Sequence, residues 1–151
     1  MTALALESGY WSALGEGVGA IILYCLIGLA LMLIGFFAID LTTPGKLRDL
    51  VVGGKPNALI VSAAGMISMA FIVVFAVLAT GGVNKLTEGL IAAVVYGLVG
   101  IIAQVVSVRI IEKVTGIDIG RTLHADTYTP EVLVVAAAHF ALGLVVAFAI
   151  L

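Results

Sequence analysis

Two long stretches without a charged residue set the strongest limit on how this chain can fold. Residues 20–39 and 57–80 contain no Asp, Glu, Lys or Arg. A helix needs about 20 predominantly apolar residues to cross the roughly 30 Å hydrocarbon core of a bilayer. Together with two further apolar runs they predict four membrane spans: Ala20–Ile39, Ala58–Ala79, Leu90–Val108 and Val132–Leu151.

The composition supports the same fold class. Hydrophobic residues make up 63% of the chain and charged residues 11%, with a mean hydropathy of +1.30. These values are typical of an integral membrane protein in contact with the lipid bilayer. We therefore predict an all-α integral membrane protein with four transmembrane helices and no separate domain outside the membrane. Residues 1–19 contain Tyr10 and Trp11, which favour the headgroup level, so we expect an interfacial N-terminal segment there.

The basic residues are distributed unevenly between the two sides. Three lie between the first and second spans and three between the third and fourth, whereas Lys85 alone lies on the other side. The six are Lys46, Arg48, Lys55, Arg109, Lys113 and Arg121. The positive-inside rule predicts a multi-pass protein with both long loops in the cytoplasm and both termini outside.

The chain also shows weak internal similarity. A shift of 72 residues aligns Tyr24 with Tyr96 and Gly28 with Gly100, and a shift of 73 aligns Phe75 with Phe148. Chance identity within an apolar alphabet is the alternative explanation. We interpret the pattern as two tandem parallel two-helix repeats, residues 20–79 and 88–151, related by an axis along the membrane normal.

A histidine lies within the fourth predicted span. His139 is about 12 Å into that helix by the helical rise, and Glu131 precedes it on the same face. Ionisable groups inside a membrane are costly and are often functional. These two residues could belong to a path for protons or cations, or His139 could be neutral and hydrogen-bonded to a neighbouring helix.

Three further polar side chains lie on helical stripes. Gln104 shares a stripe with Tyr96, and Tyr24 occupies the matching place in the first repeat. They could line a narrow intramembrane polar path, or they could hold helices together.

The loops offer a second kind of candidate site. Lys46, Arg48, Lys55 and Arg121 could dock a partner or contact anionic lipid, which attracts each basic residue by about 1 kcal/mol. Setting the topology is a sufficient alternative role for them. Asn57 follows Pro56 directly and is predicted to cap the second span.

Several function classes find no support in the sequence. It contains no hydrolase, kinase or phosphate-loop pattern, and no basic patch interleaved with aromatic residues for nucleic acid. His124 and His139 lie too far apart in the sequence to suggest a metal site. We therefore expect no enzymatic activity, no cofactor, no metal and no nucleic-acid partner.

The amino-acid sequence around the first loop resembles that of a known protein family. It reads Gly35-Phe-Phe-Ala-Ile-Asp40, then Leu-Thr-Thr-Pro-Gly-Lys-Leu-Arg-Asp49, then Asn57-Ala-Leu-Ile60. This is similar to the bacterial DUF350 family, also called UPF0719, over residues 20–151. The resemblance implies a small inner-membrane protein built from one or two copies of a two-span unit. The matching segment of the second unit, residues 115–121, lacks the proline.

The resemblance implies no biochemical activity. Small residues in all four spans favour close helix contacts, so we expect a homo-oligomeric or accessory structural subunit of a membrane complex. The alternative function is a small channel or transporter for protons or small cations.

Overall fold

The computed structural model describes residues 9–43, 45–79 and 86–150, and every regular element among them is a helix. The helices are α1 (Tyr10–Thr42), α2 (Leu47–Val52), α3 (Pro56–Ala79), α4 (Leu86–Thr115), α5 (Ile119–His124) and α6 (Glu131–Ile150). Four of them, α1, α3, α4 and α6, are long and apolar enough to cross a membrane. The predicted all-α fold is therefore confirmed, with four candidate membrane-spanning helices among the described residues.

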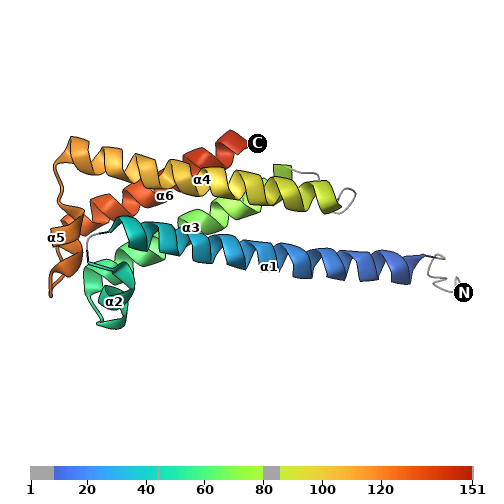
Figure 1. The fold of residues 1–151 in the computed structure, drawn as a ribbon, viewed down its shortest axis with the longest axis horizontal. Coiled ribbons are helices and arrows are strands. Elements are labelled where there is room, and N and C mark those ends of the chain that lie inside the picture. Colours follow the sequence, from blue (N-terminus) through green and yellow to red (C-terminus); the bar gives the residue numbers. More distant parts are fainter. Residues whose placement is uncertain (1–8, 44, 80–85, 151) are drawn as a thin grey trace, which may run out of the picture.

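Helix α1 begins earlier than the predicted span. It starts at Tyr10, ten residues before Ala20, and continues for 33 residues. At a rise of 1.5 Å per residue it is about 50 Å long, which exceeds the roughly 30 Å of the hydrocarbon core. Its N-terminal turns extend beyond the other helices (Figure 1). Residues 10–19 are thus a continuation of α1, and residues 1–8 of the expected interfacial segment lie outside the described part.

The four long helices alternate in direction, and α3 contacts the other three (Figure 1). Glycines allow the closest approaches. A methyl group added at Gly143 of α6 would lie 2.9 Å from Cα of Ser68 on α3. One added at Gly97 of α4 would lie 2.5 Å from Cδ1 of Leu31 on α1. Such contacts are possible only where one residue has no side chain.

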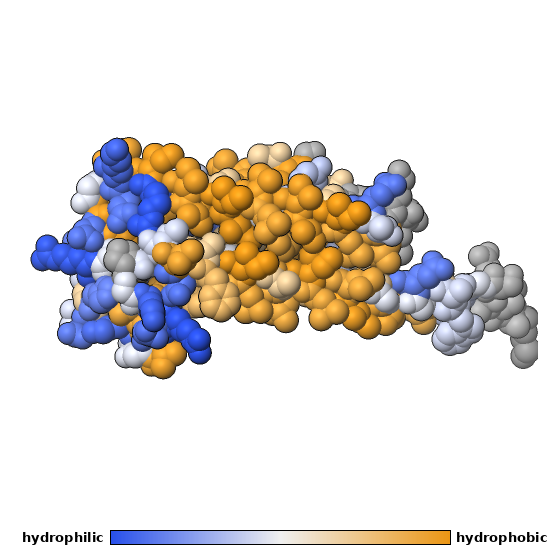
Figure 2. All heavy atoms as spheres, in the orientation of Figure 1, coloured by the Kyte–Doolittle hydropathy of each residue, from blue (hydrophilic) through white to orange (hydrophobic). Residues whose placement is uncertain are grey.

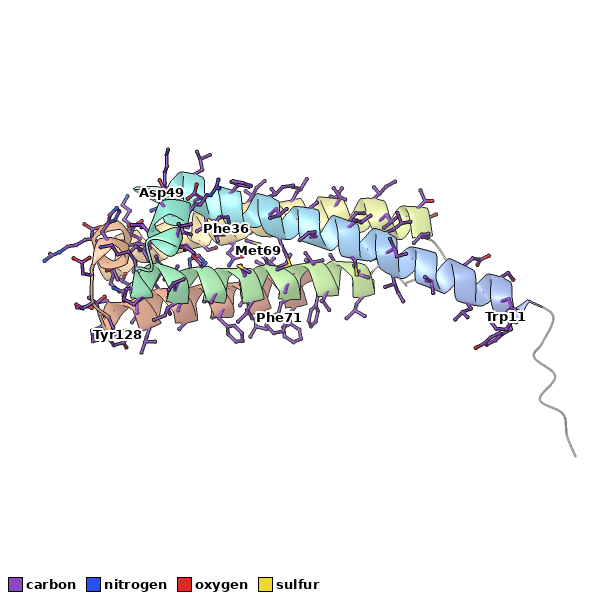
Figure 3. All side chains as sticks on the ribbon, turned by 90° about the horizontal axis from the view of Figure 1, so that it is seen from below. Trp11, Phe36, Asp49, Met69, Phe71 and Tyr128 are labelled. Carbon is purple, nitrogen blue, oxygen red and sulfur yellow. The ribbon has the colours of Figure 1, made fainter. Side chains whose placement is uncertain are left out.

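The short helices α2 and α5 cover one end of the bundle, which we call the loop end. Leu47 of α2 and Leu123 of α5 are fully buried and extend the apolar core beyond the long helices. Figure 2 shows the result, a broad apolar surface along the bundle and a polar cap over the loop end. In Figure 3, Asp49 and Tyr128 mark the loop end, and Trp11 lies at the opposite end of α1.

The turn after α1 is held by local hydrogen bonds. Asp40 Oδ1 accepts a hydrogen bond from the backbone N–H of Arg48 at 2.9 Å, and Thr43 Oγ1 donates to the carbonyl of Ile39 at 2.8 Å. Asp40, which directly follows the first predicted span, therefore fixes the start of α2.

Candidate functional site

A cluster of three polar side chains lies inside the bundle. Ser68 of α3, Gln104 of α4 and His139 of α6 are all buried. Gln104 Nε2 donates to Ser68 Oγ at 2.7 Å and lies 3.3 Å from His139 Nδ1. Ser68 Oγ in turn donates to the backbone carbonyl of His139 at 2.8 Å. The core polar cluster, Ser68, Gln104 and His139, thus joins three membrane-spanning helices.

The geometry of the cluster matches one tautomer of the imidazole. A donor at Gln104 Nε2 makes His139 Nδ1 an acceptor, which leaves the ring hydrogen on Nε2. His139 also lines a cavity of about 20 Å³ that reaches Thr43 and Arg109 at the loop end. That volume is enough for about one water molecule. Gln104 Oε1 is buried and has no hydrogen-bond partner among the described residues.

The structure brings together only two of the five residues assigned to an intramembrane path. Gln104 and His139 are in contact, but Glu131 is exposed at the start of α6. Tyr96 is 41% exposed and lines an apolar surface hollow of about 400 Å³ between α4 and α6. The hydroxyl of Tyr24 is buried without a hydrogen-bond partner among the described residues. Ser68, which was not among the predicted site residues, completes the cluster.

The prediction that Asn57 caps the second span is wrong, because α3 already begins at Pro56. Asn57 is the second residue of α3, and its side chain is fully buried. Its Nδ2 donates to the carbonyls of Thr122 and Thr127 at 2.8 and 3.1 Å, and its Oδ1 accepts from the N–H of Thr129 at 3.1 Å. The Asn57 side chain therefore holds the loop between α5 and α6 against the start of α3, a role that an isolated Asn in a sequence does not reveal.

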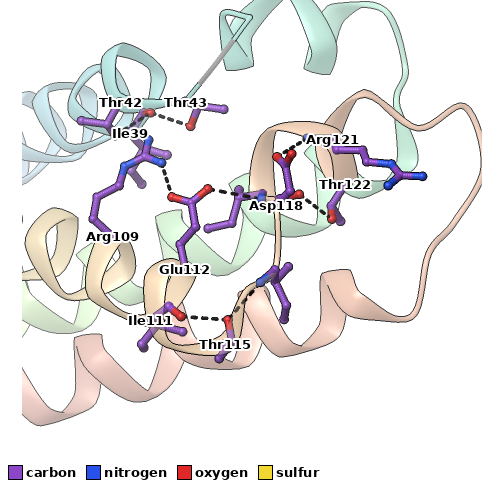
Figure 4. Close-up of polar contacts among 12 residues, drawn as sticks. Ile39, Thr42, Thr43, Arg109, Ile111, Glu112, Thr115, Asp118, Arg121 and Thr122 are labelled. Carbon is purple, nitrogen blue, oxygen red and sulfur yellow. Dashed lines mark hydrogen bonds and ion pairs between the residues drawn. The ribbon is translucent and has the colours of Figure 1, made fainter.

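Two ion pairs reinforce the loop end. Lys55 pairs with Asp126, and Arg109 Nη1 lies 2.5 Å from Glu112 Oε2. Glu112 Oε1 also accepts a hydrogen bond from the N–H of Ile119 at 3.3 Å, which ties α4 to α5 (Figure 4). The hydrogen bond and the charge of Lys55 lower the pKa of the Asp126 carboxyl below its usual 3.8.

The four basic residues assigned to docking are not equivalent in the structure. Lys55 is paired with Asp126 across the two loops. Lys46 is exposed and precedes α2 with a φ of 55°, and Arg48 is exposed on α2. Arg121 is exposed on α5 and lines a hollow of about 500 Å³ that also contains Asp118 and Glu131. We call this the loop-end hollow. It brings together Arg121 and Glu131, which the sequence had suggested for two different sites.

Comparison with known proteins places the chain in a family. The family model described as "Domain of Unknown Function (DUF350)" matches residues 13–150. A UPF0719 transmembrane protein of Mycolicibacterium paratuberculosis is 42% identical over 88 residues, which cover 58% of this chain and 57% of that protein. One of Mycobacterium bovis is 40% identical over 83 residues, covering 54% and 53%.

The aligned parts thus span little more than half the length of these curated relatives. No solved structure matches the chain. The family match covers most of the chain, and the named relatives are called transmembrane proteins, in agreement with the four apolar helices. The chain therefore belongs to the DUF350 family, to which the sequence around its first loop had pointed.

Proposed function

We propose that this protein is a non-enzymatic structural subunit of a bacterial inner-membrane complex, either as a homo-oligomer or as an accessory subunit. The projecting part of α1 carries the proposal. Gly15 and Gly19 are spaced i, i+4 on one face of the helix. Methyl groups added at these positions would meet no other described atom within 4 Å apart from the adjoining backbone of α1 itself. A pair of small residues at this spacing lets a second helix approach closely.

The exposure of α1 supports the same proposal. Within its most apolar 18-residue window only 17% of the residues are buried by the rest of the chain, against 39% for α3. Gly17 lies on the opposite side of the helix from Gly15 and Gly19, and it too has open space around it. Gly17 is therefore a matched control for substitutions on the Gly15–Gly19 face.

The proposed arrangement within the membrane follows the charges. The loop end carries Arg48, Lys55 and Arg121, so we place it in the cytoplasm and both termini outside. We further propose that the bundle is a duplicated two-helix hairpin. Equivalent contacts support this: a methyl group at Gly28 would lie 3.2 Å from Val73 Cγ1, and one at Gly100 would lie 3.2 Å from Val146 Cγ1.

Oligomeric state tests the proposed function directly. The full chain would be extracted in mild detergent, and its mass and co-purifying proteins would be measured by light scattering and mass spectrometry. We expect an assembly larger than one chain, which Gly15→Leu with Gly19→Leu disrupts and Gly17→Leu preserves. A monodisperse single chain without a stoichiometric partner would overturn the proposal.

The core polar cluster favours a second candidate, conduction of protons or small cations. Its support is the small cavity lined by both His139 and Arg109, together with Gln104 Oε1, which has no hydrogen-bond partner among the described residues. In this case His139→Ala would abolish flux through liposome membranes, whereas substitutions at Lys46, Arg48 or Arg121 would change the flux only slightly. The proposed structural role predicts the opposite ranking. The substitutions at Lys46, Arg48 or Arg121 would abolish partner capture, and His139→Ala would reduce it only slightly.

A further inference from the structure

The loop-end hollow contains a cation and an anion that are unpaired within the described residues. Arg121 and Glu131 both line it, and the side chain of neither makes an ion pair or hydrogen bond with another described residue. By contrast, Lys55 and Arg109 at the same end of the bundle are both paired. The hollow therefore offers one charge of each sign to a ligand.

A third charged group in the hollow is already engaged. Asp118 is the N-cap of α5, and its Oδ1 accepts a hydrogen bond from the backbone N–H of Arg121 at 2.9 Å. A simple anion at Arg121 would share the hollow with the carboxylates of Asp118 and Glu131, which would repel it. A ligand that carries its own positive group beside a phosphate would instead find a partner for each charge.

The depth of the hollow in the membrane indicates where such a ligand comes from. Helix α6 begins at Glu131 and has 20 residues, the length that crosses the hydrocarbon core. Glu131 therefore lies at the hydrocarbon boundary, where phospholipid headgroups are located. Ile117 adds an apolar side chain to the lining.

We propose that the loop-end hollow binds the headgroup of a phospholipid that carries a phosphate and a primary ammonium group. Arg121 donates to the phosphate, for which its planar guanidinium is well suited. Glu131 accepts hydrogen bonds from the ammonium group. The proposed subunit role also uses Arg121, but Glu131 and the lipid-binding test on a single chain belong to the lipid site alone.

Lipids that differ only in the headgroup test the assignment. The delipidated full chain in detergent would be mixed with lipids of identical acyl chains bearing phosphoethanolamine, phosphocholine or phosphoglycerol, and bound lipid would be measured by native mass spectrometry. We expect phosphoethanolamine lipid to bind about two- to fivefold more tightly than phosphocholine lipid, the range expected for one partly exposed ion pair. The trimethylated group has no N–H to donate to Glu131.

Single substitutions distinguish the role of Arg121 in lipid binding from that of Glu131. Arg121→Gln is expected to weaken binding of both zwitterionic lipids, whereas Glu131→Gln is expected to remove only the preference for phosphoethanolamine. Lys113→Gln and Asp49→Asn change exposed charges outside the hollow and are expected to leave binding unchanged. Circular dichroism of each variant would verify that it is folded.

Three outcomes would overturn the proposal. The first is equal binding of all three headgroups to the unmodified chain. The second is an unchanged headgroup preference in Glu131→Gln. The third is displacement of the lipid by free phosphoethanolamine at equal concentration, which would assign the hollow to a soluble ligand.

Discussion

At the scale of single residues, the side chain of Asn57 makes several hydrogen bonds that a substitution would remove. Its side chain makes hydrogen bonds to the backbone of Thr122, Thr127 and Thr129 from a fully buried position. Removing one partner of a buried hydrogen bond leaves the other unsatisfied, which costs about 1–3 kcal/mol. Asn57→Ala should therefore lower the free energy of unfolding in detergent by at least that amount.

A matched variant separates the Asn57 hydrogen bonds from a general effect of the loop. Thr127 is exposed and contributes only its backbone carbonyl, so Thr127→Ala should leave the melting temperature nearly unchanged. Equal melting temperatures for the Asn57→Ala variant and the unmodified chain would contradict the structural role of Asn57.

Asp126 predicts a pH dependence at the loop end. Its pKa is lowered in the folded chain by the hydrogen bond and charge of Lys55. The pair therefore stabilises the fold fully above the ordinary carboxyl pKa near 3.8, and this contribution disappears as the pH falls through the lower folded value. Lys55→Met should return the pKa of Asp126 toward its usual value, which NMR titration of the carboxyl carbon would detect. An unchanged titration curve would exclude Lys55 as the cause.

At the scale of elements, the contact between α3 and α6 depends on a missing side chain. A methyl group at Gly143 would lie 2.8 Å from Cβ and 2.9 Å from Cα of Ser68, so the two helices would have to move apart. Overpacking of this kind costs about 1–3 kcal/mol. We expect Gly143→Ala to lower the thermal stability in detergent and Gly17→Ala, which adds a methyl group in open space, to leave it unchanged. Comparable stability of the two variants would contradict the close α3–α6 contact.

The sequence predicted the positions of the helices better than it predicted which side chains contact one another. Uncharged runs predicted four helices because the bilayer requires a minimum apolar length. The start of α1 was missed because Gly15, Gly17 and Gly19 interrupt the apolar pattern without ending the helix. Gln104 and His139 were each assigned to a polar path or to a helix contact, but their contact with each other and with Ser68 was not predicted. Which side chains meet depends on the rotation of each helix, which the sequence does not reveal.

At the scale of the whole molecule, the proposed orientation can be tested with cysteines. Cys25 would first be replaced by serine, and single cysteines would then be introduced at Asp49 and Trp11, which mark opposite ends of the bundle (Figure 3). A membrane-impermeant maleimide applied to intact spheroplasts should label the Trp11 site and leave the Asp49 site unlabelled until the membrane is opened. The opposite pattern would reverse the assigned topology.

The contacts of Asn57 also have a consequence for how the protein is made. Its partners Thr122, Thr127 and Thr129 follow it by about 70 residues. At synthesis rates of about 5–20 residues per second, they emerge from the ribosome roughly 4–14 s after Asn57 does. During that interval the amide at the start of α3 has only water or lipid headgroups to bond with. The first pair of helices therefore enters the membrane before the Asn57 side chain has its hydrogen-bond partners. A chaperone or insertase that shields this end would act on the nascent chain within that interval.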